Sequence, residues 1–219
     1  MTSTQHQLRK TPFERFLMGQ RPEEVDQLFM RLPVNLIFRL RCLNSTFFLA
    51  VEAYCARTWD VHKVLDRWFY RPRSFLDTLD KCEGIVTGSQ ALRFLDRHGT
   101  YVPRDLDIYV PLHGLLPMGR WLKSEGFFYQ ESAGKHALFD AAAVMCTAGM
   151  TSTTMAPSHR ARTFATFNFF RTADDTLDFL DMSGRRVQLV AIKGSPVEFM
   201  INNFHSSEFI DSSGYLCTV

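Results

Sequence analysis

Two carboxylates, Asp105 and Asp107, lie two positions apart in a segment, residues 105–110, whose other members are apolar or aromatic. This composition predicts a β-strand, in which side chains at positions i and i+2 share one face. Two carboxylates held side by side repel each other unless a cation or a proton neutralises them. Because Mg²⁺ is often bound by one or two carboxylates together with phosphate oxygens, the pair predicts a Mg²⁺ (or Mn²⁺) site.

A second feature, Gly88-Ser89, stands between a predicted short strand at residues 85–87 and a predicted helix at residues 90–97. Glycine permits a sharp turn at a strand end, and the Ser89 hydroxyl and the first helical amides can hold a phosphate. The plainer alternative is an exposed strand face on which the acids of residues 105–107 pair with Arg104 or another arginine.

The order of these features, Gly88-Ser89, a helix and then Asp105-Leu106-Asp107 on the next strand, resembles the nucleotidyltransferase superfold, the polymerase-beta-like family, over roughly residues 80–205. The resemblance implies that Gly88 and Ser89 hold the phosphates of a nucleoside triphosphate. It also implies that Asp105 and Asp107 bind Mg²⁺. A third acid on a later strand would complete an in-line displacement with two metal ions.

The sequence departs from this family at two points. Fifteen residues separate Ser89 from Asp105, which is longer than the family pattern. The predicted third catalytic position is Gln188, whose amide offers a neutral oxygen but no negative charge. Asp178 and Asp181 are the substitutes if the strand alignment shifts. Two functions therefore stay open: a metal-dependent nucleotidyltransferase, or a catalytically degenerate relative that binds a nucleotide or a protein partner.

The helical part of the chain, residues 31–73, resembles an F-box, the three-helix segment that docks on a Skp-type adaptor of a ubiquitin ligase. Arg39 and Arg41 stand among the helix positions, but the resemblance is carried by Leu32-Pro33, Leu36-Ile37, Leu40, Leu43, Tyr54-Cys55 and Trp59. The segment has eight Lys or Arg and three Asp or Glu, a net charge of +5. The alternative is a small helical bundle that packs against the sheet domain and leaves a solvated basic face.

Most of the chain also resembles a group of proteins from mushroom-forming fungi that join an N-terminal helical segment to the pattern SGSxALQFFxR and SDLDLYV. The corresponding segments here are residues 87–97 and 104–110, and residues 196–207, PVEFMINNFHSS, match as well. This resemblance implies a fold and a lineage but no activity.

Alternating strand-like and helix-like segments predict an α+β fold, a nucleotidyltransferase-like mixed sheet flanked by helices and preceded by a small helical segment. We expect a polar N-terminal segment at 1–30, the F-box-like segment at 31–73 and the sheet domain at 74–219. Besides those named above, strands are predicted near 127–129, 163–171 and 185–192, helices near 75–79, 115–125 and from Pro196, and a loop at 140–158.

The composition limits the kinds of protein and the cellular compartments that fit this sequence. Hydrophobic residues make up 46% of the 219, enough for a packed core, and no run reaches the length of a membrane span. The five cysteines show no metal or redox spacing, and the first residues lack the apolar region of a signal peptide. We therefore expect a cytoplasmic or nuclear protein. The net charge of +2 does not indicate a nucleic-acid partner.

Overall fold

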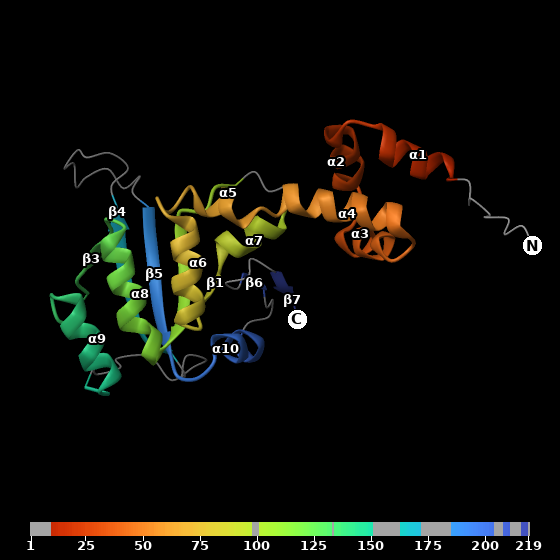
Figure 1. Cartoon of the computed structure of the whole chain (residues 1–219). Helices are drawn as coiled ribbons and strands as arrows, with labels where there is room; N and C mark the ends of the chain where they lie inside the picture. Colours follow the sequence, from red (N-terminus) through yellow and green to blue (C-terminus); the bar gives the residue numbers. More distant parts are fainter. Residues whose placement is uncertain are drawn as a thin grey trace, which may run out of the picture. The chain divides into compact units, whose positions relative to one another are not determined.

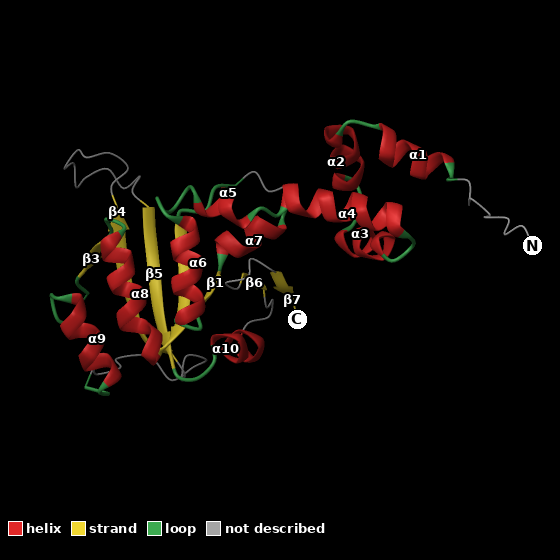
Figure 2. Cartoon of the chain, viewed as in Figure 1, coloured by secondary structure: helices red, strands yellow, loops and turns green. Residues whose placement is uncertain are grey.

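The computed structural model describes residues 10–97, 101–132, 134–150, 163–171, 185–203, 208–210 and 216–218. The chain divides into two compact units, Met1–Asp60 and Val61–Val219, and each is described by itself. Figure 1 labels their elements, and Figure 2 shows that the described part of the first unit is helical, whereas the second combines helices and strands. The predicted boundary at residues 73 and 74 differs from this division.

The first unit contains α1 (Pro12–Gly19), α2 (Pro22–Met30), α3 (Val34–Arg41) and α4 (Ser45–Thr58). Thr11 begins α1 with a capping box, in which Glu14 returns the hydrogen bond of the Thr11 side chain. The Asn44 side chain caps α4 by accepting from the amides of Thr46 and Phe47. Both helices therefore begin where local side chains satisfy amides that no helical carbonyl can reach.

The core of this unit draws on all four helices. Its buried members are Leu17, Val25, Phe29, Ile37, Phe47, Val51 and Tyr54. Three of them come from residues 1–30, so apolar residues within this mostly polar segment contribute to the core. The reason is spacing: Val25 and Phe29 are four residues apart and therefore share one face of α2.

The second unit begins with α5 (Val61–Leu65) and α6 (Pro72–Lys81). Between these helices, the Phe69 ring stacks on Phe75 and meets Trp121 edge-on. Residues 61–73 therefore belong to the core of the sheet-containing unit, and the predicted F-box-like segment of 31–73 is divided between two units.

Among the described residues, seven strands form one mixed sheet in the order β3-β4-β5-β2-β1-β6-β7. The strands are β1 (Ile85–Thr87), β2 (Asp105–Pro111), β3 (Phe128–Gln130), β4 (Thr163–Arg171), β5 (Arg185–Ile192), β6 (Glu208–Ile210) and β7 (Leu216–Thr218). Neighbouring β2 and β5 run parallel, and the other pairs run antiparallel. The predicted α+β class with a mixed sheet and flanking helices is confirmed.

The sheet has one face covered by helices α6, α8 (Leu112–Ser124) and α9 (Phe139–Thr147). Figure 1 shows α6 and α8 lying across the central strands. Leu106 and Ile108 of β2 are fully buried on this face. Phe139 of α9 packs its ring against Phe167 and Phe169 of β4.

The opposite face is covered at one end by α10 (Pro196–Asn203). Phe199 and Met200 of α10 pack with Ile85, Val190 and Ile192 of the sheet, and Tyr109 and Val197 are packed against this cluster. Because Tyr109 is two residues from Asp107 on β2, the predicted acid pair lies on this face. Met200 of α10 also contacts the Thr87 hydroxyl, whose residue pairs with Asp107.

The loop predicted at residues 140–158 is wrong for its first part, because residues 139–147 form α9. The apolar residues of this segment show little helical periodicity, so the sequence pattern did not predict the helix. Three consecutive alanines nevertheless favour helix formation, and the Phe139 ring packs in the core at the start of the helix. Residues 151–158 lie outside the described part. No helix among the described residues is both long and apolar enough to span a membrane.

Candidate functional site

The Gly-Ser turn and the second acid of the pair are in direct contact. Gly88 has φ +74°, in the region that favours glycine, and it precedes α7 (Ser89–Leu95). A Cβ atom at Gly88 would lie closer than 3.0 Å to the Asp107 carboxylate oxygen Oδ2. Thr87 also pairs with Asp107 across β1 and β2. Glycine is therefore required here both for the turn and for the space that Asp107 fills.

The first acid of the pair is neutralised by an arginine. Arg186 stands opposite Asp105 on the parallel strand β5. Its Nε donates to Asp105 Oδ1 at 2.7 Å, and its Nη2 donates to Oδ2. This is the bidentate pairing in which Arg matches a carboxylate best. The hydrogen bonds to Asp105 raise the pKa of Arg186 above its ordinary value.

Within the described part of the chain, no side chain forms an ion pair with the second acid, and its acidity reflects its burial. Burial raises the pKa of Asp107 to about 6, the neighbouring Asp105 carboxylate adds to the rise, and Arg186 opposes it. The two acids therefore differ in environment, although they share one face. Asp105 forms an ion pair with Arg186, whereas burial raises the pKa of the Asp107 carboxyl to about 6.

The predicted third position does lie beside the acid pair, because Gln188 of β5 stands directly opposite Asp107. Its amide supplies no charge. The possible substitutes Asp178 and Asp181 lie outside the described residues.

The donor set does not fit a two-metal centre within the described ranges. No group of three or more His, Cys, Asp or Glu side chains able to hold a metal occurs there. Both carboxylate oxygens of Asp105 accept from Arg186, which leaves Asp107 as the acid whose oxygens are not already paired. Gly88, Asp105 and Asp107 therefore lie close together in the fold. The neighbouring strand β5, which was expected to carry the third acid, places Arg186 and Gln188 beside them instead.

Arg186 is the site residue that sequence reasoning missed. Pairing of the acids with some arginine was foreseen, but Arg104 was the named candidate because it is adjacent in the sequence. The signal lies in the register: once β5 is aligned parallel to β2 with Gln188 beside Asp107, Arg186 must stand beside Asp105. Sequence distance alone does not show this pairing, since the two residues are 81 positions apart.

Asp107 belongs to a wider polar row that crosses five strands. From β1 to β3 its members, each paired in register with the next, are Thr87, Asp107, Gln188, Asn168 and Gln130. Residues directly opposite each other on neighbouring strands point to the same face. The Oδ1 atom of Asn168 is buried, and no described residue donates a hydrogen bond to it, an uncommon state for a buried oxygen.

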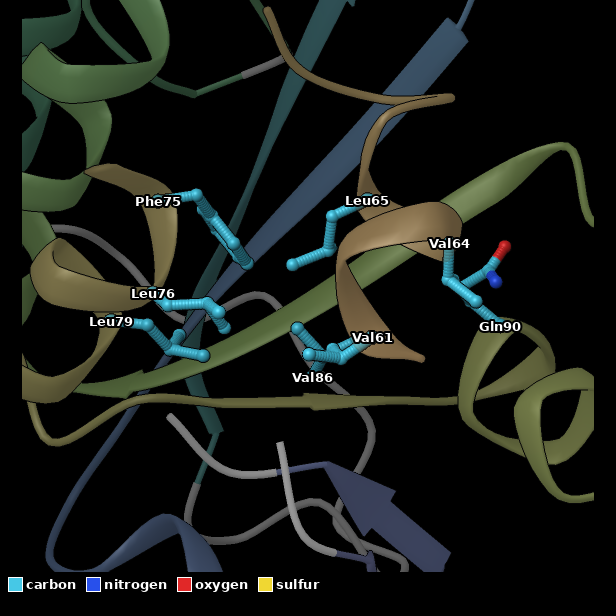
Figure 3. A pocket seen from close by; sticks show the side chains of 8 residues that line it. All are labelled: Val61, Val64, Leu65, Phe75, Leu76, Leu79, Val86 and Gln90. Carbon is cyan, nitrogen blue, oxygen red and sulfur yellow. The ribbon is translucent and has the colours of Figure 1, made fainter. Parts of the chain in front are cut away.

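A cavity of about 10 Å³ lies on the other face of the sheet. Its lining residues come from α5, α6, β1 and α7 and are Val61, Val64, Leu65, Phe75, Leu76, Leu79, Val86 and Gln90 (Figure 3). Val86 pairs with Ile108, so it faces away from Asp107. A space of this size holds about one water molecule. This cavity is therefore no nucleotide site, and the polar row remains the candidate site.

The segment predicted to dock on an adaptor has mixed exposure. Ile37 and Tyr54, two of the residues that carried the F-box resemblance, are fully buried in the core of the first unit. Leu36 and Leu43 are exposed, and so are Phe48 and Leu49 on α4. Part of the expected apolar face is therefore used inside the unit, and part is presented at its surface.

Comparison of the chain with protein-family models, with curated proteins and with solved structures finds no match.

Proposed function

We propose that this protein binds a nucleotide on a nucleotidyltransferase-like sheet and does so without the two-metal chemistry of that family. The observation that carries the proposal is the ion pair between Asp105 and Arg186 next to the contact between Gly88 and Asp107. The Gly-Ser turn and the acid strand are joined as the motif predicts, while a fixed arginine supplies the positive charge that a metal ion would otherwise bring.

The electrostatics of the site support binding over catalysis. In-line nucleotidyl transfer needs negative ligands for metal ions that clamp the attacking and leaving oxygens. Here the parallel strand supplies a guanidinium and an amide, Arg186 and Gln188, opposite the two acids. Gly88 and Ser89 would contact phosphates, and Asp107 would contact a hydroxyl or amino hydrogen of the ligand.

Titration of the full chain with fluorescent nucleoside triphosphates, in Mg²⁺ and separately in EDTA, tests this proposal. We expect binding that survives EDTA, and a loss of affinity in Gly88→Ala, because the added Cβ displaces the Asp107 carboxylate. Asp77→Asn, an exposed acid on α6, is the matched control. Failure of every nucleotide to bind in both buffers would refute the proposal.

The metal-dependent transferase predicted from the motif is the competing outcome of the same titration. It requires binding that appears only with Mg²⁺ and disappears in Asp107→Asn. It also requires release of pyrophosphate when an acceptor is present, which a coupled phosphate assay detects.

We also propose a docking role for the first unit, with a Skp-type adaptor as the partner that the F-box resemblance suggests. The exposure of Leu43 at 63% and Leu49 at 66% favours this role, because large apolar side chains at a surface are candidate contact residues. Pulldown of the full chain with purified adaptor tests it. We expect retention that Leu43→Asp with Leu49→Asp abolishes, whereas absence of retention by the unmodified chain would refute the docking role.

A further inference from the structure

A basic and aromatic segment, residues 67–73 with the sequence RWFYRPR, lies between the end of α5 and the first turn of α6. It contains three arginines and no acid. Trp68 and Phe69 are buried in the core of the second unit, whereas the three arginines are exposed and Tyr70 is 79% exposed. The two buried rings therefore fix the segment on the unit and leave a tyrosine and three arginines at the surface.

The Tyr70 ring lies on a further arginine, Arg171, the last residue of β4. The Cζ atom of Arg171 is 4.4 Å from the centroid of the Tyr70 ring and 4.7 Å from that of Phe127. Its guanidinium donates to the backbone carbonyls of Trp68 and Glu125. Because Arg171 is only 6% exposed, it fixes the Tyr70 ring and adds positive charge next to it, while the exposed side chains are free to meet a ligand.

Positive charge is in excess where this segment meets the sheet. Arg185, the first residue of β5, pairs in register with Arg171, and like charges directly opposite each other on neighbouring strands are destabilising. Burial lowers the pKa of Arg171, and the charge of Arg185 adds to the decrease. The buried acid next to Arg171, Glu125, forms an ion pair with Arg71. This group therefore has three arginines and one acid, and a bound anion would relieve the repulsion among them.

We propose that residues 67–73 and Arg185 bind single-stranded nucleic acid, with its phosphates on the arginines and a base stacked on Tyr70. The proposal goes beyond the nucleotide bound at Gly88 and does not depend on it. The net charge of +2 for the whole chain does not predict such a partner. The local excess of arginine beside an exposed ring is what favours it.

The chemistry of these side chains matches the ligand. A guanidinium can bind a phosphate through two parallel hydrogen bonds. An aromatic side chain stacks on an unpaired base of any type, so an exposed ring among arginines favours a single strand over an anion without bases. Arg67 and Arg73 are each three residues from Tyr70, which places their backbones within about 11 Å of it, a distance that about three stacked nucleotides span.

Fluorescence anisotropy of a labelled oligothymidylate, titrated with the full chain at several salt concentrations, tests the proposal. The full chain is used because residues 172–184, which join Arg171 to Arg185, carry four aspartates that belong to the charge balance. Combined Arg67→Gln and Arg73→Gln should weaken binding and reduce the slope of log affinity against log salt by about 1.4, or about 0.7 for each phosphate contact. Tyr70→Leu should weaken binding by about tenfold and leave the slope unchanged.

The matched control is Lys81→Gln combined with Lys193→Gln, which also removes two exposed positive charges. Lys81 ends α6, and Lys193 follows the last residue of β5, so both are at the far ends of these elements from the proposed site. This variant should bind as the unmodified chain does. A loss of affinity equal to that of the double arginine variant would overturn the proposed location.

Inorganic polyphosphate and vesicles containing phosphatidylserine, added as competitors, separate nucleic acid from other anions. We expect polyphosphate to compete through the arginines and its binding to be unaffected by Tyr70→Leu, because it has no base to stack. Tighter binding of the vesicles than of the oligonucleotide, or oligonucleotide binding that is unaffected by Tyr70→Leu, would overturn the inference. Absence of oligonucleotide binding would also overturn it and would leave the proposed nucleotide site untouched.

Discussion

Replacement of Asp107 by Asn should stabilise the second unit at neutral and alkaline pH and leave it unchanged at acidic pH. The pKa of Asp107 is raised from 3.8 to about 6 in the folded protein. Asn keeps the shape of the side chain against Gly88 but carries no charge. The substitution therefore isolates the free-energy cost of ionising a carboxyl that is buried beside another acid.

The sign of the effect follows from proton binding. Between pH 4 and 6 the folded state holds a proton on Asp107 that the unfolded state has already released, so stability falls as the pH rises. A pKa difference of about two units corresponds to about 3 kcal/mol in the free energy of unfolding. The full penalty is present above the folded pKa and absent below about pH 4.

Hydrogen–deuterium exchange of the β2 and β5 amides measures this free energy separately from the helical first unit. Between pH 4 and 8, the unmodified chain should lose about 3 kcal/mol relative to Asp107→Asn. Asp77→Asn, on the exposed side of α6, should follow the unmodified chain at every pH. Parallel stability profiles for the unmodified chain and Asp107→Asn would refute the inference that ionising the buried Asp107 carboxyl destabilises the folded state.

Three further substitutions test the packing that positions the site. Gly88→Ala should lower the free energy of unfolding by about 1–3 kcal/mol, because the backbone has positive φ and a carboxylate fills the space; urea denaturation checks this. Gly119→Ala should lower the free energy of unfolding by a similar amount, because its Cβ would lie within 3.0 Å of the Phe139 ring. A decrease below ~0.5 kcal/mol would contradict the contact between α8 and α9. Glu125→Ala should lower the free energy of unfolding by about 3 kcal/mol. This buried acid accepts hydrogen bonds from the Arg71 side chain and from the amides of Tyr70 and Arg71. Thermal melts that match those of the unmodified chain would count against that role.

The local pattern of the sequence was sufficient to place the acid pair and its turn. Alternation of acid and apolar residues predicted that Asp105 and Asp107 share a face, and the burial of Leu106 and Ile108 confirms the opposite face as core. The last long strand was also recognised, and Gln188 does lie beside Asp107.

What the sequence did not reveal depends on register and on distant packing. Arg186 was overlooked because its proximity to Asp105 requires β5 to run parallel to β2 in one particular alignment. The helix at Phe139–Thr147 was missed because its stability comes from Phe139 in contact with β4 more than from an amphipathic pattern.

The division between the units shows the same limitation. Residues 61–73 continue the helical composition of the residues before them, so composition placed them in the first unit. Their core contacts, such as Phe69 on Phe75 and Trp121, are formed with residues that follow in the chain. The contacts of a side chain decide the unit to which it belongs, and the sequence pattern alone does not show those contacts.

We infer that Arg186 neutralises Asp105 and that the site binds no pair of metal ions. Electron paramagnetic resonance of Mn²⁺ added to the full chain, with nucleotide present, measures this most directly because bound Mn²⁺ loses the signal of the free ion. We expect the protein–nucleotide mixture to bind no more Mn²⁺ than the nucleotide alone, and Asp107→Asn to change nothing. One or two additional Mn²⁺ ions bound per chain, and lost in Asp107→Asn, would contradict it.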